Sequence, residues 1–308
     1  MDKKEYGLTR LVLGPTPFAV IERRDYLAIA EAKKRLLECL LLEDGFDLMV
    51  ENYLELETTL LQASVRDVLG DPPFEQRSHD DVNLFSRRFA NLMTVCKMYR
   101  DQAPARLKRL FPEDPKKKDE IGARFDALRD QRLGYLVIEI LRHHVQHAGL
   151  PIDAVTYGHS HVGPLGGGAS KTTIAPSVSV SRLLLDRKIT DDVRQRMANV
   201  GRDLLDLRDM VRDYVEGLAS VHDGIRVDLR VKIEEWQAVL QEAWSRYRSV
   251  DPENGNLPGL SAVIRDADGM ILEETELPRH PQQSRRHLER KNRNLGNLRS
   301  MFVSSEVC

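Results

Sequence analysis

The sequence predicts a mostly α-helical protein with a small β-hairpin insertion and a C-terminal β-hairpin. Hydrophobic residues make up 41% and charged residues 31% of the 308 residues, a globular and helix-favouring balance. Over most of the chain, apolar residues recur at three- and four-residue steps, as on one face of an α-helix. Two stretches, 151–181 and 262–277, instead combine short strand-like runs with glycine-containing turns, which predicts the hairpins.

The helical pattern divides into five segments. In the first, expected over 25–69, five apolar residues lie on one face: Phe46, Val50, Tyr53, Leu56 and Leu60. Gly45 is a candidate break in this helix, and Asp71-Pro72-Pro73 ends it because proline cannot continue a helix. The other helices are expected over 80–101, 119–148, 190–218 and 225–244. Two prolines in residues 1–24 favour an extended arm or a short strand there.

The pattern predicts one large helical domain followed by a small C-terminal region. Residues 1–250 form the helical domain, in which about 151–181 are the hairpin insertion. Residues 251–308 are a linker, a hairpin turning at Asp268-Gly269, and a basic tail. Between residues 279 and 299 the tail has seven Arg and Lys residues against one Glu, and we expect disorder at its end.

Composition excludes several classes of protein. A net charge of −2 argues against a protein that coats nucleic acid or membrane over its whole surface. Three widely spaced cysteines argue against a disulfide framework and against a cysteine-based zinc site. The first residues lack the apolar segment of a secretory signal, and no run approaches the ~20 apolar residues of a membrane span. We therefore expect a cytoplasmic protein without a membrane partner.

The segment 133–147 has the most distinctive polar pattern. Wound as a helix, it gathers apolar residues on one broad arc and polar residues opposite, with His147 at the border; the polar arc holds Tyr135, Glu139, Arg142, His143 and Gln146. An arginine can hold phosphate through two parallel hydrogen bonds, and a histidine exchanges protons near neutral pH. A solvated helix face is the common reading of such an arc. Three of the nine histidines, however, fall within five residues here, which favours a functional site.

The segment Leu141–Ile152 (LRHHVQHAGLPI) resembles the signature of the HEPN superfamily, the higher eukaryote and prokaryote nucleotide-binding domains. That signature is Arg, a polar residue, three further positions and His, which matches Arg142, His143 and His147. Residues 50–57 and 87–102 are similar to helices that accompany the motif in uncharacterised bacterial relatives. The resemblance covers roughly residues 30–250 and implies a HEPN-like helical bundle.

The resemblance implies a metal-independent endoribonuclease that acts on RNA as a homodimer, without a cofactor. Arg142 would hold the scissile phosphate, His147 would be the general acid and base, and His143 would assist. Supporting roles are expected for Glu139, His144 and Gln146. A role as a toxin or in defence, with a protein antitoxin or regulator as partner, is implied by the same analogy. The alternatives are a non-catalytic nucleotide-binding or scaffolding protein, and a purely structural protein.

Other signals carry less chemistry. Residues 163–172 resemble a phosphate-binding loop, but Ser170 stands where glycine is required before Lys171. His143 and His147 could pair on a metal, yet the glutamate of the His-Glu-x-x-His motif is missing, so no metal site is predicted. Trp236 and Trp244 lie on an apolar stripe and are interpreted as core or interface. The basic tail is expected to contact phosphate groups without sequence preference, through Arg285, Arg286, Arg290, Lys291 and Arg293. The alternative is a solvated terminus.

Overall fold

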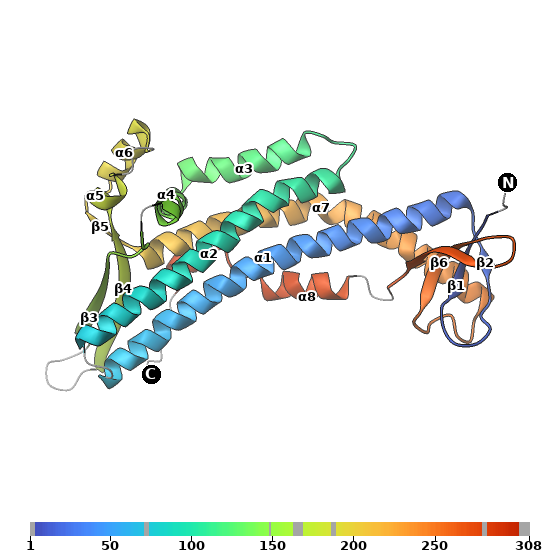
Figure 1. The fold of residues 1–308 in the computed structure, drawn as a ribbon, viewed down its shortest axis with the longest axis horizontal. Helices are drawn as coiled ribbons and strands as arrows, with labels where there is room; N and C mark the ends of the chain where they lie inside the picture. The colour runs from blue at the N-terminus through green and yellow to red at the C-terminus, as the bar shows by residue number, and fades with distance from the viewer. Residues whose placement is uncertain are drawn as a thin grey trace. The chain divides into compact units, whose positions relative to one another are not determined.

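A computed structural model describes residues 4–70, 74–147, 149–162, 169–185, 189–278 and 282–301. Side chains at positions 74, 146, 147, 162 and 169 fall outside that description. The chain is mostly helical, with two small antiparallel sheets (Figure 1). It divides into two compact units, each built from three chain segments. Unit 1 contains residues 1–44, 106–115 and 224–293, and unit 2 contains residues 45–105, 116–223 and 294–308.

The first two helices agree with the predicted pattern, with one difference in length. Helix α1 (Arg23–Leu69) continues through Gly45 without a break. Helix α2 (Phe74–Leu110) is longer than the predicted range 80–101 and contains Pro104. Proline normally disfavours a helix interior. Here the apolar face continues from Ala103, before the proline, to Leu107 and Leu110 after it, and all three residues are buried.

The single helix predicted over 119–148 is wrong: two helices, α3 (Lys117–Gln131) and α4 (Leu133–His147), take its place. Between them Arg132 has extended backbone, with φ −128° and ψ 122°. Its guanidinium donates to Asp213 at 3.0 Å and to Glu216 at 3.2 Å, both on α7 (Leu207–Val250). These partners are far away in the sequence, so the local periodicity of 119–148 could not indicate the break.

The hairpin predicted within 151–181 is confirmed in unit 2 and is longer than expected. Strand β3 (Ala154–Val162) pairs antiparallel with β4 (Ala169–Ser179), and β5 (Leu204–Asp206) completes a sheet of order β3-β4-β5. The glycine-rich loop 163–168 lies outside the described residues.

The helix predicted over 190–218 is wrong as a single element. After the short α5 (Val180–Leu183), helix α6 (Asp191–Ala198) ends, and Gly201 adopts a positive φ of 72°. The chain then enters β5 before α7 begins at Leu207. Helix α7 covers both the last part of the range 190–218 and the separate helix expected over 225–244. The apolar spacing of Val200 and Leu204 indicated helix, but pairing of β5 with β4 overrides it.

The sheet of unit 1 joins the two ends of the chain. Its strands are β1 (Glu5–Arg10), β2 (Ala19–Val20), β6 (Leu260–Arg265) and β7 (Ile271–Glu276), in the order β2-β1-β6-β7. The predicted C-terminal hairpin is therefore confirmed. Residues 251–293, which include β6 and β7, belong to the same unit as the N-terminal strands, and residues 294–308 belong to unit 2, so the division does not follow the predicted boundary at residue 250. Within the described residues the tail forms α8 (Gln283–Lys291) and a 3₁₀ turn, Leu298–Ser300, whereas the end of the chain, where disorder is expected, lies outside the described residues.

The core of unit 2 contains a histidine that the sequence did not single out. His222 is fully buried, stacks on Phe46 with ring centroids 3.8 Å apart, and shares a 2.6 Å hydrogen bond with the Tyr99 hydroxyl. Its Nδ1 atom is thus used within the core. We interpret His222 as a packing residue.

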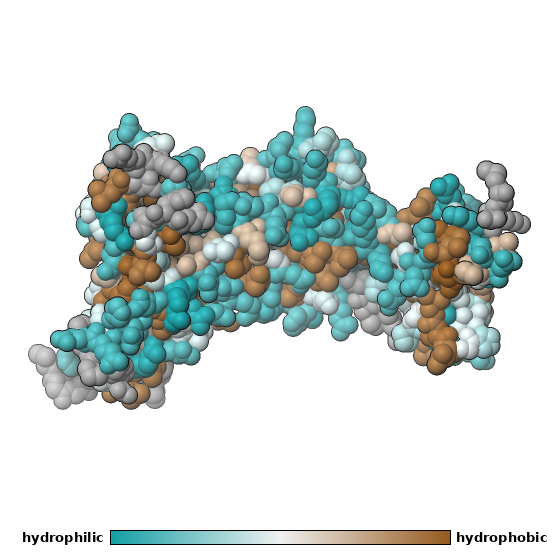
Figure 2. All heavy atoms as spheres, viewed as in Figure 1, coloured by the Kyte–Doolittle hydropathy of each residue, from teal (hydrophilic) through white to brown (hydrophobic). Residues whose placement is uncertain are grey.

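Hydrophobic side chains also reach the surface. Figure 2 shows some of them over the sheet of unit 1. The exposed apolar residues of that region are Leu11, Val12, Leu13, Val20, Met270, Ile271 and Leu272. None of the helices formed by the described residues combines the length and apolar content needed to span a bilayer.

Candidate functional site

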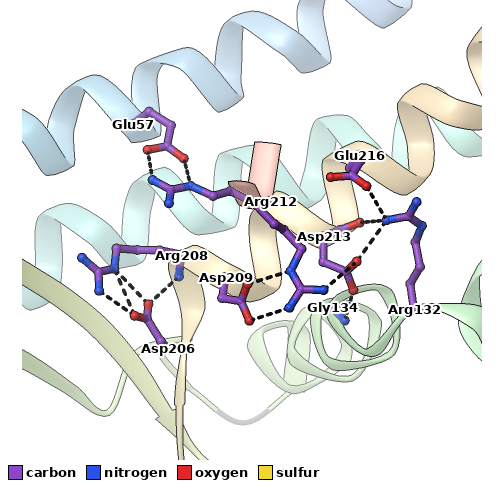
Figure 3. A network of polar contacts seen from close by, with 10 residues as sticks. Glu57, Arg132, Gly134, Asp206, Arg208, Asp209, Arg212, Asp213 and Glu216 are labelled. Atoms are coloured by element: carbon purple, nitrogen blue, oxygen red, sulfur yellow. Dashed lines mark hydrogen bonds and ion pairs between the residues drawn. The ribbon is translucent and has the colours of Figure 1, made fainter. Parts of the chain in front are cut away.

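Helix α4 is fixed at its beginning by one carboxylate of α7. Asp213 accepts from the backbone N–H of Gly134 at 2.7 Å and from Arg132 at 3.0 Å (Figure 3). A negative charge at this end of a helix also complements the helix dipole. Glycine is required at position 134, because a Cβ there would lie 2.3 Å from the carbonyl oxygen of Met210. The helix that carries the predicted motif is therefore docked closely against α7.

Glu139, one of the predicted supporting residues, accepts from three side chains. Arg100 of α2 donates to it at 2.9 Å, the Tyr214 hydroxyl of α7 donates at 3.2 Å, and Arg142 approaches at 3.4 Å. Burial holds the pKa of Tyr214 well above its ordinary value, so this hydroxyl remains a donor. Glu139 thereby links three helices of unit 2 and holds Arg142 from one side.

Arg100 is a cation of this site that the sequence did not reveal. Besides Glu139 it pairs with Asp126 of α3 at 2.8 Å, and it lies over the ring of Tyr135. Burial acts to lower the pKa of Arg100, but Tyr135, Glu139 and Asp126 outweigh it, and the pKa is raised. Arg100 therefore carries its charge at any physiological pH.

These residues surround a pocket of about 520 Å³ in unit 2, within the range of pockets that hold small ligands. Three arginines and a histidine face two carboxylates in it, which gives a cationic lining. Its apolar wall includes Leu136 and Ile140 of α4. The lining consists of Arg100, Asp126, Arg129, Tyr135, Leu136, Glu139, Ile140, Arg142, His143, Ile189 and Val193.

The structure places part of the predicted motif at this pocket. Arg142 and His143 both line it and are half-buried. Glu139, from the preceding turn of α4, also lines the pocket and is half-buried. His144 is half-buried and is not part of the lining. The backbone of His147 ends α4, but the side chains of His147 and Gln146 lie outside the described residues. The pairing of Arg142 with His147 therefore stays a prediction.

One residue of the predicted polar arc belongs to the core instead. Tyr135 is 1% exposed and packs against Tyr214 with ring centroids 5.1 Å apart. The beginning of α4 is buried on all sides between α2, α3 and α7. The prediction of one buried and one exposed face therefore does not hold for this part of the helix. Arg100, Asp126 and Arg129 were missed because they come from other helices and carry no motif of their own.

The basic tail is divided between buried and exposed arginines. Arg285, a predicted phosphate contact, is 8% exposed, and its guanidinium donates to Gln282 and Glu289. We therefore correct its role to a structural one within α8. The other four predicted contacts are exposed, and their binding to phosphate stays a prediction: Arg286, Arg290, Lys291 and Arg293.

Within the described residues, no three His, Cys, Asp or Glu side chains gather in a way that could hold a metal ion. Comparison with family models, with curated proteins and with solved structures finds no match to this chain. The proposal for its function therefore depends on the motif and on the pocket.

Proposed function

We propose that this protein is a metal-independent endoribonuclease of the HEPN kind and that the pocket beside α4 receives the RNA backbone. The supporting observation is the lining itself: Arg142 and His143 of the motif share one cationic pocket with Arg100 and Arg129. Such a lining suits a phosphodiester, because arginine binds phosphate through charge-assisted and often bidentate hydrogen bonds.

In the proposed reaction, the ribose 2′-hydroxyl attacks the adjacent phosphorus and loses its proton to a histidine acting as general base. The bond from phosphorus to the 5′-oxygen breaks, and that oxygen takes a proton from a general acid. The products are a 2′,3′-cyclic phosphate and a free 5′-hydroxyl. Arg142, oriented by Glu139, would neutralise the phosphate, and the resemblance assigns the proton transfers to His147 with help from His143. A homodimer would bring two such motifs to one cleft.

The test is cleavage of an RNA pool by the purified protein in EDTA. His147→Ala is expected to slow cleavage by about 10²–10⁴-fold, the usual contribution of a positioned acid or base. Arg142→Ala is expected to slow it by about 10²–10³-fold, the usual cost of removing one electrostatic contact to the transition state. Arg202→Ala and His161→Ala are matched controls, because both residues are exposed and lie outside the pocket lining. Equal losses in all four variants, or cleavage that leaves a 3′-hydroxyl, would contradict the proposal.

A non-catalytic role is the second candidate. Arg142 is already held by Glu139, and a pocket of about 520 Å³ can accommodate a bound nucleotide without any reaction. Wild-type protein that leaves every RNA intact, yet loses nucleotide binding on Arg142→Ala, would favour this role. A toxin or defence function with a protein antitoxin or regulator belongs to the proposal by analogy only, and co-purification of a tight partner from its own cells would test it.

A further inference from the structure

Unit 1 contains a second pocket, between α7 and α8, that the proposed function does not use. Its volume is about 640 Å³, and a neighbouring hollow of about 450 Å³ shares Gln237, Arg286 and Glu289 with it. The larger pocket has a partly apolar wall made by Leu240, Trp244 and Pro278. Its volume is in the range that holds a small organic ligand.

Trp244 presents an unused hydrogen-bond donor at this pocket. The indole Nε1 atom is buried, yet it has no acceptor among the described residues. An indole N–H can only donate, and a buried donor without an acceptor costs about 1–3 kcal/mol. Its apolar stripe predicts a core or interface position for Trp244, and in the structure the half-buried residue lines this pocket.

Gln282 supplies a second unused donor. Its side chain is among the most buried in the tail, with 6% of the residue exposed, and it lines the same pocket. The amide oxygen must face Arg285, because a guanidinium only donates hydrogen bonds. The amide nitrogen Nε2 is then left without an acceptor within the described part of the chain.

The charges around the pocket are also unbalanced. Arg286 forms no ion pair with any described residue, and Arg290 donates only to the backbone oxygen of Arg286, at 3.2 Å. The carboxylate of Glu289 is taken by Arg285. The unsatisfied groups identified among the residues that line this pocket are donors and cations, so a ligand that is rich in acceptors and negatively charged would complement them.

We propose that this pocket binds a nucleoside phosphate, either free or as one residue of single-stranded RNA. The base would stack on Trp244, lie against Leu240 and accept from Gln282. The indole N–H, which points out in the plane of its ring, would donate to a ribose or phosphate oxygen, and Arg286 and Arg290 would bind the phosphate. Aromatic stacking and charge together are the usual basis of recognition for an unpaired nucleotide. The pocket is built within unit 1 alone, so this inference does not depend on the proposed nuclease site in unit 2.

Isothermal titration of the full-length protein tests the proposal with AMP, ATP, a five-nucleotide oligoadenylate and inorganic tripolyphosphate. AMP or the oligonucleotide is expected to bind, and tripolyphosphate at least tenfold more weakly. Arg286→Gln should weaken nucleotide binding about tenfold. Gln282→Glu keeps the oxygen that faces Arg285 but replaces the N–H donor of the amide with a negatively charged acceptor. It should weaken nucleotide binding at least as much as Arg286→Gln does. Arg248→Gln, on α7 and outside the pocket lining, is the matched control.

The outcomes separate the two sources of ligand. Tight binding of AMP identifies a free nucleotide, whereas a tenfold preference for the oligonucleotide identifies RNA. Either result supports the proposal if Arg286→Gln and Gln282→Glu weaken binding and Arg142→Ala, in unit 2, does not. Equal effects of Arg286→Gln and Arg248→Gln, equal affinity for tripolyphosphate, or the absence of binding at millimolar nucleotide would overturn it.

Discussion

Glu139 shows how a single side chain can link the stability of unit 2 to the geometry of its pocket. It accepts from Arg100, Tyr214 and Arg142, and its side chain is 16% exposed. Hydrogen bonds to charged groups in such partly buried surroundings contribute more than exposed ion pairs do. The residue expected to support the motif is thus also an anchor between three helices.

Replacing Glu139 with Gln should lower the free energy of unfolding by about 2 kcal/mol, because the shape is kept but the charge that faces two arginines is lost. Urea unfolding followed by circular dichroism measures the change. Glu55→Gln is the matched control, since the side chain of Glu55 is 55% exposed and pairs at the surface with Arg88. Its loss should stay under about 1 kcal/mol. Equal losses of unfolding free energy in the two variants would show that the contacts of Glu139 stabilise the protein no more than an exposed ion pair does.

One buried thiol of unit 1, that of Cys39, makes the stability of the protein depend on alkaline pH in a predictable way. Burial raises the pKa of Cys39 to about 12, from an ordinary value of 9.0. Between these values the unfolded chain has lost the thiol proton while the folded chain keeps it. Stability should therefore fall as the pH rises above 9, by about 1 kcal/mol per pH unit for this group. In Cys39→Ala the fall between pH 9 and 11, measured by urea unfolding, should be shallower; identical slopes would contradict the assignment.

At the scale of a helix, the docking of α4 against α7 can be tested with two glycines. Gly134→Ala should destabilise the protein by about 2 kcal/mol, because the new methyl would meet the Met210 carbonyl oxygen at 2.3 Å. Gly122→Ala, in α3, meets nothing within 4 Å and should stabilise the protein by about 0.5–1 kcal/mol through its helix propensity. Opposite signs of the two changes in thermal or urea unfolding are the expected result, and a neutral Gly134→Ala would contradict the close approach.

The elements that the sequence predicts well are those whose pattern is local. The apolar face from Phe46 to Leu60 indicates α1 correctly, and Asp268-Gly269 indicates the turn between β6 and β7. The break at Arg132 and the strand β5 depend on partners on α7 and β4, which no window of neighbouring residues contains. Long-range pairing therefore explains the main errors.

The candidate site also combines residues that a local pattern predicts with residues that only long-range folding brings together. The motif at Arg142 and His143 is local, and the structure places both residues at one pocket. Arg100, Asp126 and Arg129 complete that pocket from α2 and α3, and a single sequence gives no reason to select them among 46 Lys and Arg and 48 Asp and Glu residues. Trp244 and Gln282 were missed because an unsatisfied donor can be recognised only once its surroundings are known.

For the whole chain, three of the five boundaries between the segments of the two units fall inside helices. Residues 44–45 lie in α1, residues 105–106 in α2 and residues 223–224 in α7. Unfolding one unit alone would have to end three helices at these points. Each new helix end would leave backbone N–H and C=O groups without their hydrogen-bond partners. The helical segments that remain would also be less stable in water, because short isolated helices are only marginally stable. We therefore expect the two units to unfold in one cooperative transition.

The two tryptophans make this cooperativity measurable. Trp236 and Trp244 both belong to unit 1, so tryptophan fluorescence reports on that unit, while far-ultraviolet circular dichroism reports on all helices. Gly134→Ala acts in unit 2, yet it should move the urea midpoint of the fluorescence signal as far as that of the circular dichroism signal. Glu55→Gln should leave both midpoints nearly unchanged. A fluorescence midpoint that stays fixed while the dichroism midpoint falls would mean that the helices melt at the unit boundaries and that the units unfold separately.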